Sequence, residues 1–89
     1  MHLSVVIVSY NVKYFLEQCL AALQLSVQGL DAEIWVVDNN STDGSVAYLQ
    51  PLFPDVHFVA KKQNAGFAKA NNSVLPYCKG AFVLFLNPD

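Results

Sequence analysis

Three residues with ligand-binding side chains stand at or just beyond the ends of apolar runs in this sequence. Tyr10 ends the first run, Asp38 ends the second, and Asp89 comes shortly after the last. An aromatic ring can pack on a planar base, and a carboxylate can accept hydrogen bonds or hold a cation. These groups can act together only if the fold brings the separate run ends to one place.

The apolar runs predict β-strands, because they are short and rich in β-branched residues. Segments with helical periodicity separate them. Pro51 is expected to end the second helix and Pro76 to weaken the third. The expected strands are 3–10, 32–38, 56–60 and 81–86, and the expected helices are 11–29, 43–50 and 67–78.

The first helix carries the clearest signals. Asn11 suits its N-cap, and Gly29 lies where the helix should close. Cys19 falls on the core-facing side, and both it and Cys78 are interpreted as structural thiols, since two cysteines do not make a disulfide framework. The apolar residues at helical spacing are Phe15, Leu16, Cys19, Leu20, Leu23 and Val27.

Strands that alternate with helices predict an α/β fold, in which one domain over residues 1–89 has three layers. A mostly parallel four-stranded sheet lies between the helices, with right-handed crossovers. Ligands of such sheets bind beyond the carboxyl ends of the strands. Polar residues are concentrated in the loops at that edge and are sparser in the opposite loops, an asymmetry that the fold alone does not require.

Composition excludes several classes of function. Hydrophobic residues make up 54% of the chain and charged residues 13%, which is too apolar for a disordered protein. The net charge is -2 and all five basic residues are lysines, so nucleic-acid binding has little electrostatic support. No apolar run is long enough for a membrane span, and the start lacks the features of a signal peptide, so a cytoplasmic location is expected.

The loop after the first strand narrows the choice of ligand. It reads S-Y-N in place of the glycine-rich G-x-G-x-x-G of a dinucleotide site, and the chain has no P-loop. It also has no acidic pair of the kind that a phosphoacceptor domain needs. A nucleotide held by an aromatic residue and two acids remains. The alternatives are a non-catalytic nucleotide-binding module and a plain α/β interaction domain.

Four motifs in order resemble the amino-terminal half of family 2 glycosyltransferases, which have the GT-A fold, and most closely their rhamnosyltransferase-like branch. They are VSYN at 8–11, VVDNNSTDGS at 36–45, NAGFAKANN at 64–72 and LFLNPD at 84–89. The resemblance implies a Rossmann-like half with strand order 3-2-1-4 that binds the nucleotide of a sugar donor. It implies a parent enzyme that acts on a glycan or a lipid-linked acceptor. A lipid-linked acceptor would place that enzyme at the inner face of the membrane. In enzymes of that family the acceptor site and the catalytic base lie in the carboxyl-terminal half. Residues 1–89 are therefore expected to contain no catalytic residue and to be inactive alone.

The resemblance assigns roles at the base and ribose. Tyr10 would lie against the base, and backbone groups of Ser9 and Asn11 would meet its carbonyls and the ribose. The Asp38 carboxylate would accept from the ring N–H of a pyrimidine, which implies a UDP- or dTDP-sugar. The alternative for Asp38 is a turn acid that caps the second helix.

Further contacts are implied at two turns. Asn64 and Gly66 would let the backbone approach the ligand at the start of the third helix, where negative charge is favoured. Asn40 is a candidate contact, although Asn39, Asn40 and Asp43 are also interpreted as turn formers. Ser41, Thr42 and Asp43 are interpreted as caps of the second helix. Many relatives have a basic residue where Asn71 stands and a glycine where Val74 stands, and both departures weaken the case for diphosphate contacts from this helix.

Asp89 would hold the metal. In GT-A enzymes the last carboxylate of an Asp-x-Asp element binds a divalent cation, here Mg²⁺ or Mn²⁺, that bridges the donor phosphates. Asn87 replaces the first Asp of that element. The alternative is a strand-ending Asn-Pro turn. The strand 81–86 would lie at one edge of the sheet with unshielded apolar side chains, which predicts a homodimer through that edge.

Overall fold

The structure, a computed structural model, describes residues 2–64 and 66–86. The element order is that predicted from the sequence, with a short 3-10 turn added after the third helix. The elements are β1 (Leu3–Ser9), α1 (Lys13–Ser26), β2 (Ala32–Asp38), α2 (Ser45–Leu49), β3 (His57–Ala60), α3 (Phe67–Val74), η1 (Leu75–Tyr77) and β4 (Phe82–Leu86).

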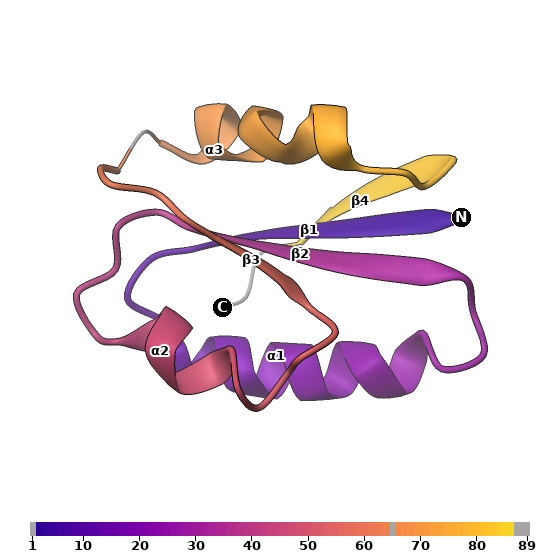
Figure 1. The fold of residues 1–89 in the computed structure, drawn as a ribbon, viewed down its shortest axis with the longest axis horizontal. Helices are drawn as coiled ribbons and strands as arrows, with labels where there is room; N and C mark the ends of the chain where they lie inside the picture. The colour runs from indigo at the N-terminus through magenta and orange to yellow at the C-terminus, as the bar shows by residue number, and fades with distance from the viewer. Residues whose placement is uncertain (1, 65, 87–89) are drawn as a thin grey trace.

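The four described strands form one sheet in the order β3-β2-β1-β4, and every neighbouring pair is parallel. Helices α1 and α2 lie on one side of the sheet and α3 lies on the other, as Figure 1 shows. The three-layer α/β/α fold and the strand order 3-2-1-4 are therefore confirmed. Because all neighbouring strands are parallel, the carboxyl ends of β1, β2 and β3 lie at one edge, and the strand order reverses between β1 and β4.

Each face of the sheet packs its own cluster of buried residues. Side chains alternate along a strand, so Val5 and Ile7 of β1 face α1, whereas Val6 and Val8 face α3. The larger cluster contains Val5, Ile7, Leu16, Leu20, Ile34, Val36, Leu49, Phe53 and Val56. The smaller cluster contains Val6, Val8, Val37, Ala70 and Val74. Because helices cover both faces of the sheet at β1 and β2, these strands are apolar at successive positions rather than at every second one.

Two expectations for the first helix are wrong. Val12, not Asn11, is the N-cap residue, and its side chain makes no capping bond. Asn11 has φ 53°, in the left-handed region, and its side chain bonds to a neighbouring loop instead. Phe15 is 61% exposed, since it lies about 100° round the helix from Leu16, and the sheet buries only the side marked by Leu16 and Leu20.

The remaining helix signals agree with the structure. Helix α2 ends at Leu49, two residues before Pro51, and α3 gives way to a 3-10 turn that contains Pro76. Cys19 and Cys78 are free, partly buried thiols on opposite sides of the sheet, and burial raises the pKa of each. In the described part of the chain, no helix has the length and apolar character that crossing a bilayer requires.

A buried carboxylate anchors the segment that leads into β4. Glu33 accepts hydrogen bonds from the Ser4 hydroxyl at 2.5 Å and from the Lys79 amide at 2.6 Å. The Gly80 amide in turn donates to Ser4 Oγ at 2.8 Å. A Cβ atom at Gly80 would lie 2.4 Å from the Ser4 nitrogen, so only glycine allows this approach. These contacts fix the register in which β4 pairs with β1.

Candidate functional site

The centre of the candidate site is the pair Ser9 and Asp38, which lie opposite each other at the ends of β1 and β2. The Ser9 hydroxyl donates to Asp38 Oδ1 at 3.4 Å, and the Ser41 amide donates to Asp38 Oδ2 at 3.0 Å. Asp38 is 5% exposed. Its main-chain carbonyl accepts from the Lys61 amide at 2.8 Å, which joins the loop after β3 to the same point. The carboxylate is thus held by the end of β1 and by the loop after β2, while the Asp38 backbone is held by the residue that follows β3.

The loop after β1 is clasped to the loop after β2. The Asn11 amide donates to Ser41 Oγ at 2.9 Å, and Asn11 Oδ1 accepts from the Thr42 amide at 2.7 Å. The Ser9 carbonyl accepts from the Asn39 amide at 2.8 Å. The Ser9 carbonyl and the Asn11 amide, two of the backbone groups expected to meet a ligand, therefore already have partners inside the protein. A further contact to the Ser9 carbonyl would use its second lone pair.

Asp43 couples the two helices on this side of the sheet. Its Oδ2 accepts from the Lys13 amide at 3.1 Å at the start of α1, and its Oδ1 accepts from the amide and hydroxyl of Ser45 at the start of α2. Burial acts to raise the pKa of Asp43, but the hydrogen bonds from Ser45 and Lys13 outweigh it and hold the pKa below its ordinary value. Asp43 therefore supplies the helix capping that Asn11 does not.

The loops after β2 and β3 meet through two asparagines. Asn39 Nδ2 donates to Asn64 Oδ1 at 2.8 Å, and the same oxygen accepts from the Gly66 amide at 3.0 Å. Gly66 has φ 84° and ψ 164°, a conformation open to glycine, and is the N-cap residue of α3. Asn64 is exposed, and its Nδ2 group has no acceptor among the described residues. This amide is available to a ligand.

Two further candidates point toward solvent. Tyr10 is 48% exposed at the end of β1, where a flat ligand could pack against its ring. Asn40 is exposed with φ 67°, so its turn-forming role is evident and any ligand contact stays a prediction. On α3, Asn71 is 6% exposed and its Oδ1 lacks a hydrogen-bond donor among the described residues.

The expected metal ligand, Asp89, lies outside the described residues, as does Asn87. The described acids do not replace them, because Asp38 and Asp43 are bonded to backbone amides that fix the loops. No group of three or more His, Cys, Asp or Glu residues suited to a metal occurs within residues 2–64 and 66–86. The described part of the chain thus fits a divalent cation only if Asp89 and the ligand supply the oxygens.

Sequence reasoning missed the bridging role of Asn39, which was interpreted only as a turn former. It is 3% exposed, and a buried asparagine at a strand end needs a partner. Ser41 and Thr42 were likewise interpreted as helix caps, but they hold the Asn11 loop. Only the parallel pairing of β1 with β2, which sets their loops side by side, could have suggested these contacts.

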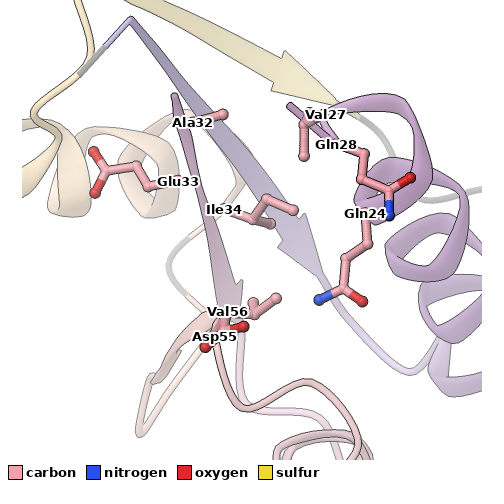
Figure 2. A pocket seen from close by; sticks show the side chains of 8 residues that line it. All are labelled: Gln24, Val27, Gln28, Ala32, Glu33, Ile34, Asp55 and Val56. Carbon is pink, nitrogen blue, oxygen red and sulfur yellow. The ribbon is translucent and has the colours of Figure 1, made fainter. Parts of the chain in front are cut away.

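A separate hollow of ≈ 300 Å³ lies at the opposite edge of the sheet, near the amino ends of β2 and β3. Figure 2 shows that Gln24 of α1 and Gln28, just after this helix, line one side of it, while the Glu33 side chain points away from them. None of the candidate site residues lines this hollow. It therefore plays no part in the site at the carboxyl edge.

A model of the family described as "Glycosyl transferase family 2" matches residues 4–89. The chain belongs to glycosyl transferase family 2. This confirms the family inferred from the four motifs, and the parallel sheet in the order β3-β2-β1-β4 is the Rossmann-like half of its GT-A fold.

Among the relatives of this family 2 chain is the minor teichoic acid biosynthesis protein GgaB of Bacillus subtilis. It is 32% identical over 90 residues, which cover 97% of this chain and 10% of GgaB. The chain thus spans about a tenth of the length of that relative.

Solved structures with the same fold include two complexes with a nucleotide sugar. Residues 1–349 of S. aureus TarS in complex with UDP-GlcNAc superpose with a TM-score of 0.80 at 27% identity, over 100% of this chain and 27% of that TarS fragment. The mannosyltransferase PcManGT of Pyrobaculum calidifontis, in complex with GDP-Man and Mn²⁺, gives a TM-score of 0.79 at 26% identity, over 99% of this chain and 27% of that one.

Proposed function

We propose that residues 1–89 are the donor-binding half of a glycosyltransferase that transfers a sugar from a nucleoside diphosphate onto a glycan or lipid-linked acceptor. The observation that carries this proposal is the buried Asp38, which is fixed by the end of β1, the loop after β2 and the residue after β3 at the edge where α/β sheets bind ligands. The complex of TarS with UDP-GlcNAc, a protein of the same fold, supports a nucleotide sugar as the ligand. The acceptor half and the catalytic base belong to the rest of the parent protein, so these residues are inactive alone.

Asp38 can be both the turn acid and the base-binding acid. A carboxylate offers about four lone-pair sites, and Ser9 and Ser41 use two of them. A pyrimidine ring N–H can take another, with Tyr10 against the face of the base. The choice of a UDP- or dTDP-sugar rests on this single N–H donor. The GDP-Man complex of PcManGT is the reason to test a purine nucleotide beside them.

The loop that starts α3 is suited to the polar part of the donor. The Asn64 amide offers N–H donors, and the lack of a side chain at Gly66 lets a ligand approach the helix N-terminus, where negative charge is stabilised. Asn40 is a further candidate contact from the loop after β2. Asn71 has no charge to offer a diphosphate, so the donors of Asn64 would carry more of that contact.

A divalent metal is part of the proposal. Asp89 would hold Mg²⁺ or Mn²⁺ together with the donor phosphates, since hard cations prefer oxygen ligands. The ion, when bound, neutralises negative charge on the diphosphate leaving group. Its presence in the complex of PcManGT with GDP-Man and Mn²⁺ supports this assignment.

We also propose that residues 1–89 by themselves form a homodimer through β4. This strand pairs with β1 on one side, and its side chains are more exposed than those of the other strands. With a lipid-linked acceptor, the parent protein would work at the cytoplasmic face of the membrane.

Titration of the ¹⁵N-labelled chain with UDP tests the central proposal. Amide shifts are expected at Tyr10, Asp38, Asn64 and Gly66, and UDP should raise the melting temperature. If UDP, dTDP and GDP all give neither shifts nor thermal protection, the chain is a plain interaction domain and the proposal is overturned. If the chain binds UDP but the parent protein transfers no sugar from any donor, the chain is a non-catalytic nucleotide-binding module.

A further inference from the structure

Three lysines line a hollow of ≈ 290 Å³ on the α3 side of the molecule. Lys61 and Lys62 come from the loop after β3, and Lys69 comes from α3. Gln63 and Ser73 complete the lining, and Lys69 and Ser73 are four residues apart, which puts them on one side of the helix. Three of the five basic residues of the chain therefore gather at one place.

The charge of this lysine hollow is not compensated. No carboxylate lines it, and within the described residues none of its three lysines makes an ion pair. Ammonium groups that share one hollow repel one another, and an anion between them would add attractions that outweigh this repulsion. Since the chain as a whole has net charge -2, this local excess of positive charge is a distinct feature of its surface.

The donors and the size suit a phosphate group. Each lysine is a compact charge with three donors and needs no fixed bidentate geometry, and Gln63 adds amide donors. The Ser73 hydroxyl donates to the Ala70 carbonyl at 2.7 Å, so it adds no donor for an anion. The hollow has the volume of about ten waters at ~30 Å³ each, which accommodates a phosphate with part of its hydration shell.

The lysine hollow borders the candidate site, and the two share only Lys61, whose backbone amide bonds to the Asp38 carbonyl while its side chain lines the hollow. Asn64 and Gly66 follow Lys62 in the same loop, yet Asn64 bonds to Asn39 and Gly66 starts α3. We propose that Lys61, Lys62 and Lys69 form a second anion site, which binds a phosphate group other than the diphosphate of a nucleotide donor. The phosphate is either a soluble phosphate or the headgroup of a phospholipid. This inference does not depend on nucleotide binding at Asp38.

Titration with inorganic phosphate, followed by ¹⁵N NMR, tests the site. Saturable shifts are expected at residues 61–63 and 69–73. The double variant Lys61→Gln/Lys69→Gln should weaken phosphate binding at least about tenfold. The matched control Lys13→Gln/Lys79→Gln removes the same charge elsewhere and should change the affinity less than about twofold.

Vesicles distinguish the sources of phosphate. Cosedimentation with phosphatidylglycerol vesicles but not with phosphatidylcholine vesicles, lost in the Lys61/Lys69 variant only, assigns the site to a lipid headgroup. Saturable shifts with inorganic phosphate but no vesicle binding assign it to a soluble phosphate.

Equal weakening in the two double variants, or no response to either probe, overturns the proposal. UDP shifts at Tyr10 and Asp38 are followed in the same variants. Failure of the lysine site is therefore distinguishable from failure of the donor site.

Discussion

Asn39 and Asn64 are joined by a hydrogen bond of 2.8 Å from Nδ2 to Oδ1, which ties the loop after β2 to the loop after β3. The Gly66 amide shares the same acceptor at 3.0 Å. One oxygen thus sets both the spacing of the two loops and the start of α3. This arrangement orders the loop that we propose for the donor before any ligand arrives, which lowers the entropy lost on binding.

Asn64→Ala should therefore loosen this loop. Loss of an acceptor with two donors is expected to cost about 1–2 kcal/mol of the free energy of unfolding. Hydrogen exchange at the Gly66 amide should accelerate more than at amides in β1. Asn72→Ala, at an exposed asparagine of α3, is the control and should change neither quantity. Unchanged exchange at Gly66 in Asn64→Ala would show that the bond does not order the loop.

Asp38 should decide nucleotide selectivity. Calorimetry is expected to give tighter binding of UDP and dTDP than of GDP, because the ring N–H of the two pyrimidines meets the carboxylate. Asp38→Ala should cost about 1–3 kcal/mol of binding free energy, since a buried hydrogen bond is left unmade.

The same substitution also removes the acceptor of the Ser41 amide, so stability must be followed beside affinity. Asp38→Asn keeps a neutral acceptor at that position and separates the two effects. Asp55→Ala, at the opposite edge, should leave UDP binding unchanged. Equal affinity for the three nucleotides would remove the argument for a pyrimidine.

Metal binding should require the nucleotide. Asp89 alone is a poor site, and the donor phosphates must supply further oxygens. Paramagnetic broadening by Mn²⁺ is expected around the carboxyl end of β4 with UDP present, and little broadening without it. Asp89→Ala should remove the effect while UDP alone still binds. Broadening centred elsewhere, or equal with and without UDP, contradicts the assignment.

Glu33 should make stability depend on acid pH. Burial acts to raise its pKa, but hydrogen bonds from Ser4 and the Lys79 amide, with smaller contributions from Trp35 and His57, hold the pKa below the ordinary value of 4.5. A carboxyl with a lowered folded pKa stabilises the fold fully above its unfolded pKa. That stabilisation is lost as the pH falls from the ordinary value of 4.5 through the lower folded pKa.

Urea unfolding of Glu33→Gln across this pH range measures the effect. The variant should be less stable at neutral pH and lose less stability on acidification than the unsubstituted chain. Glu17→Gln, at a less buried carboxylate on α1, should keep the acid dependence. Parallel pH curves for Glu33→Gln and the unsubstituted chain would show that Glu33 contributes nothing to it.

The fold could be predicted from the sequence because each strand is a separate apolar run. Strand bounds agreed within one residue, since turn residues or glycine end each run. The cap of α1 could not be predicted in this way. Asn11 has the side chain of an N-cap, but the cap donor bonds of α1 and α2 both end on Asp43, and that contact exists only after β1 and β2 pair.

The candidate site could be located but not built from the sequence. The prediction of parallel strands placed the ends of the first two strands at one edge of the sheet, and in the structure Ser9 and Asp38 lie opposite each other there. The partner of each side chain depends on the side-by-side placement of three loops, which no single-sequence pattern encodes. Hence Asn39 was interpreted as a turn residue, whereas it bridges two loops.

The exposed apolar residues of β4 carry the last prediction. Phe82 is 63% exposed, Leu84 44% and Phe85 43%, on a strand that has one described neighbour, β1. Natural sheet edges are shielded by charges, prolines or bulges, and Phe82–Leu86 contains none of these. Apolar area of this kind favours association. A two-fold axis beside β4 would pair two copies into one continuous sheet, with the Phe and Leu side chains packed across the junction.

Sedimentation of residues 1–89 should accordingly show a dimer, and Val83→Lys should shift it toward the monomer. A lysine on β4 places like charges on both copies at the junction, which opposes pairing. Leu25→Lys is the matched control, since Leu25 is 72% exposed on α1 and far from the strand edge in sequence. It should leave the dimer intact. A monomeric unsubstituted chain, or equal association of all three proteins, would mean that β4 does not mediate self-pairing and that the apolar edge is tolerated in solution.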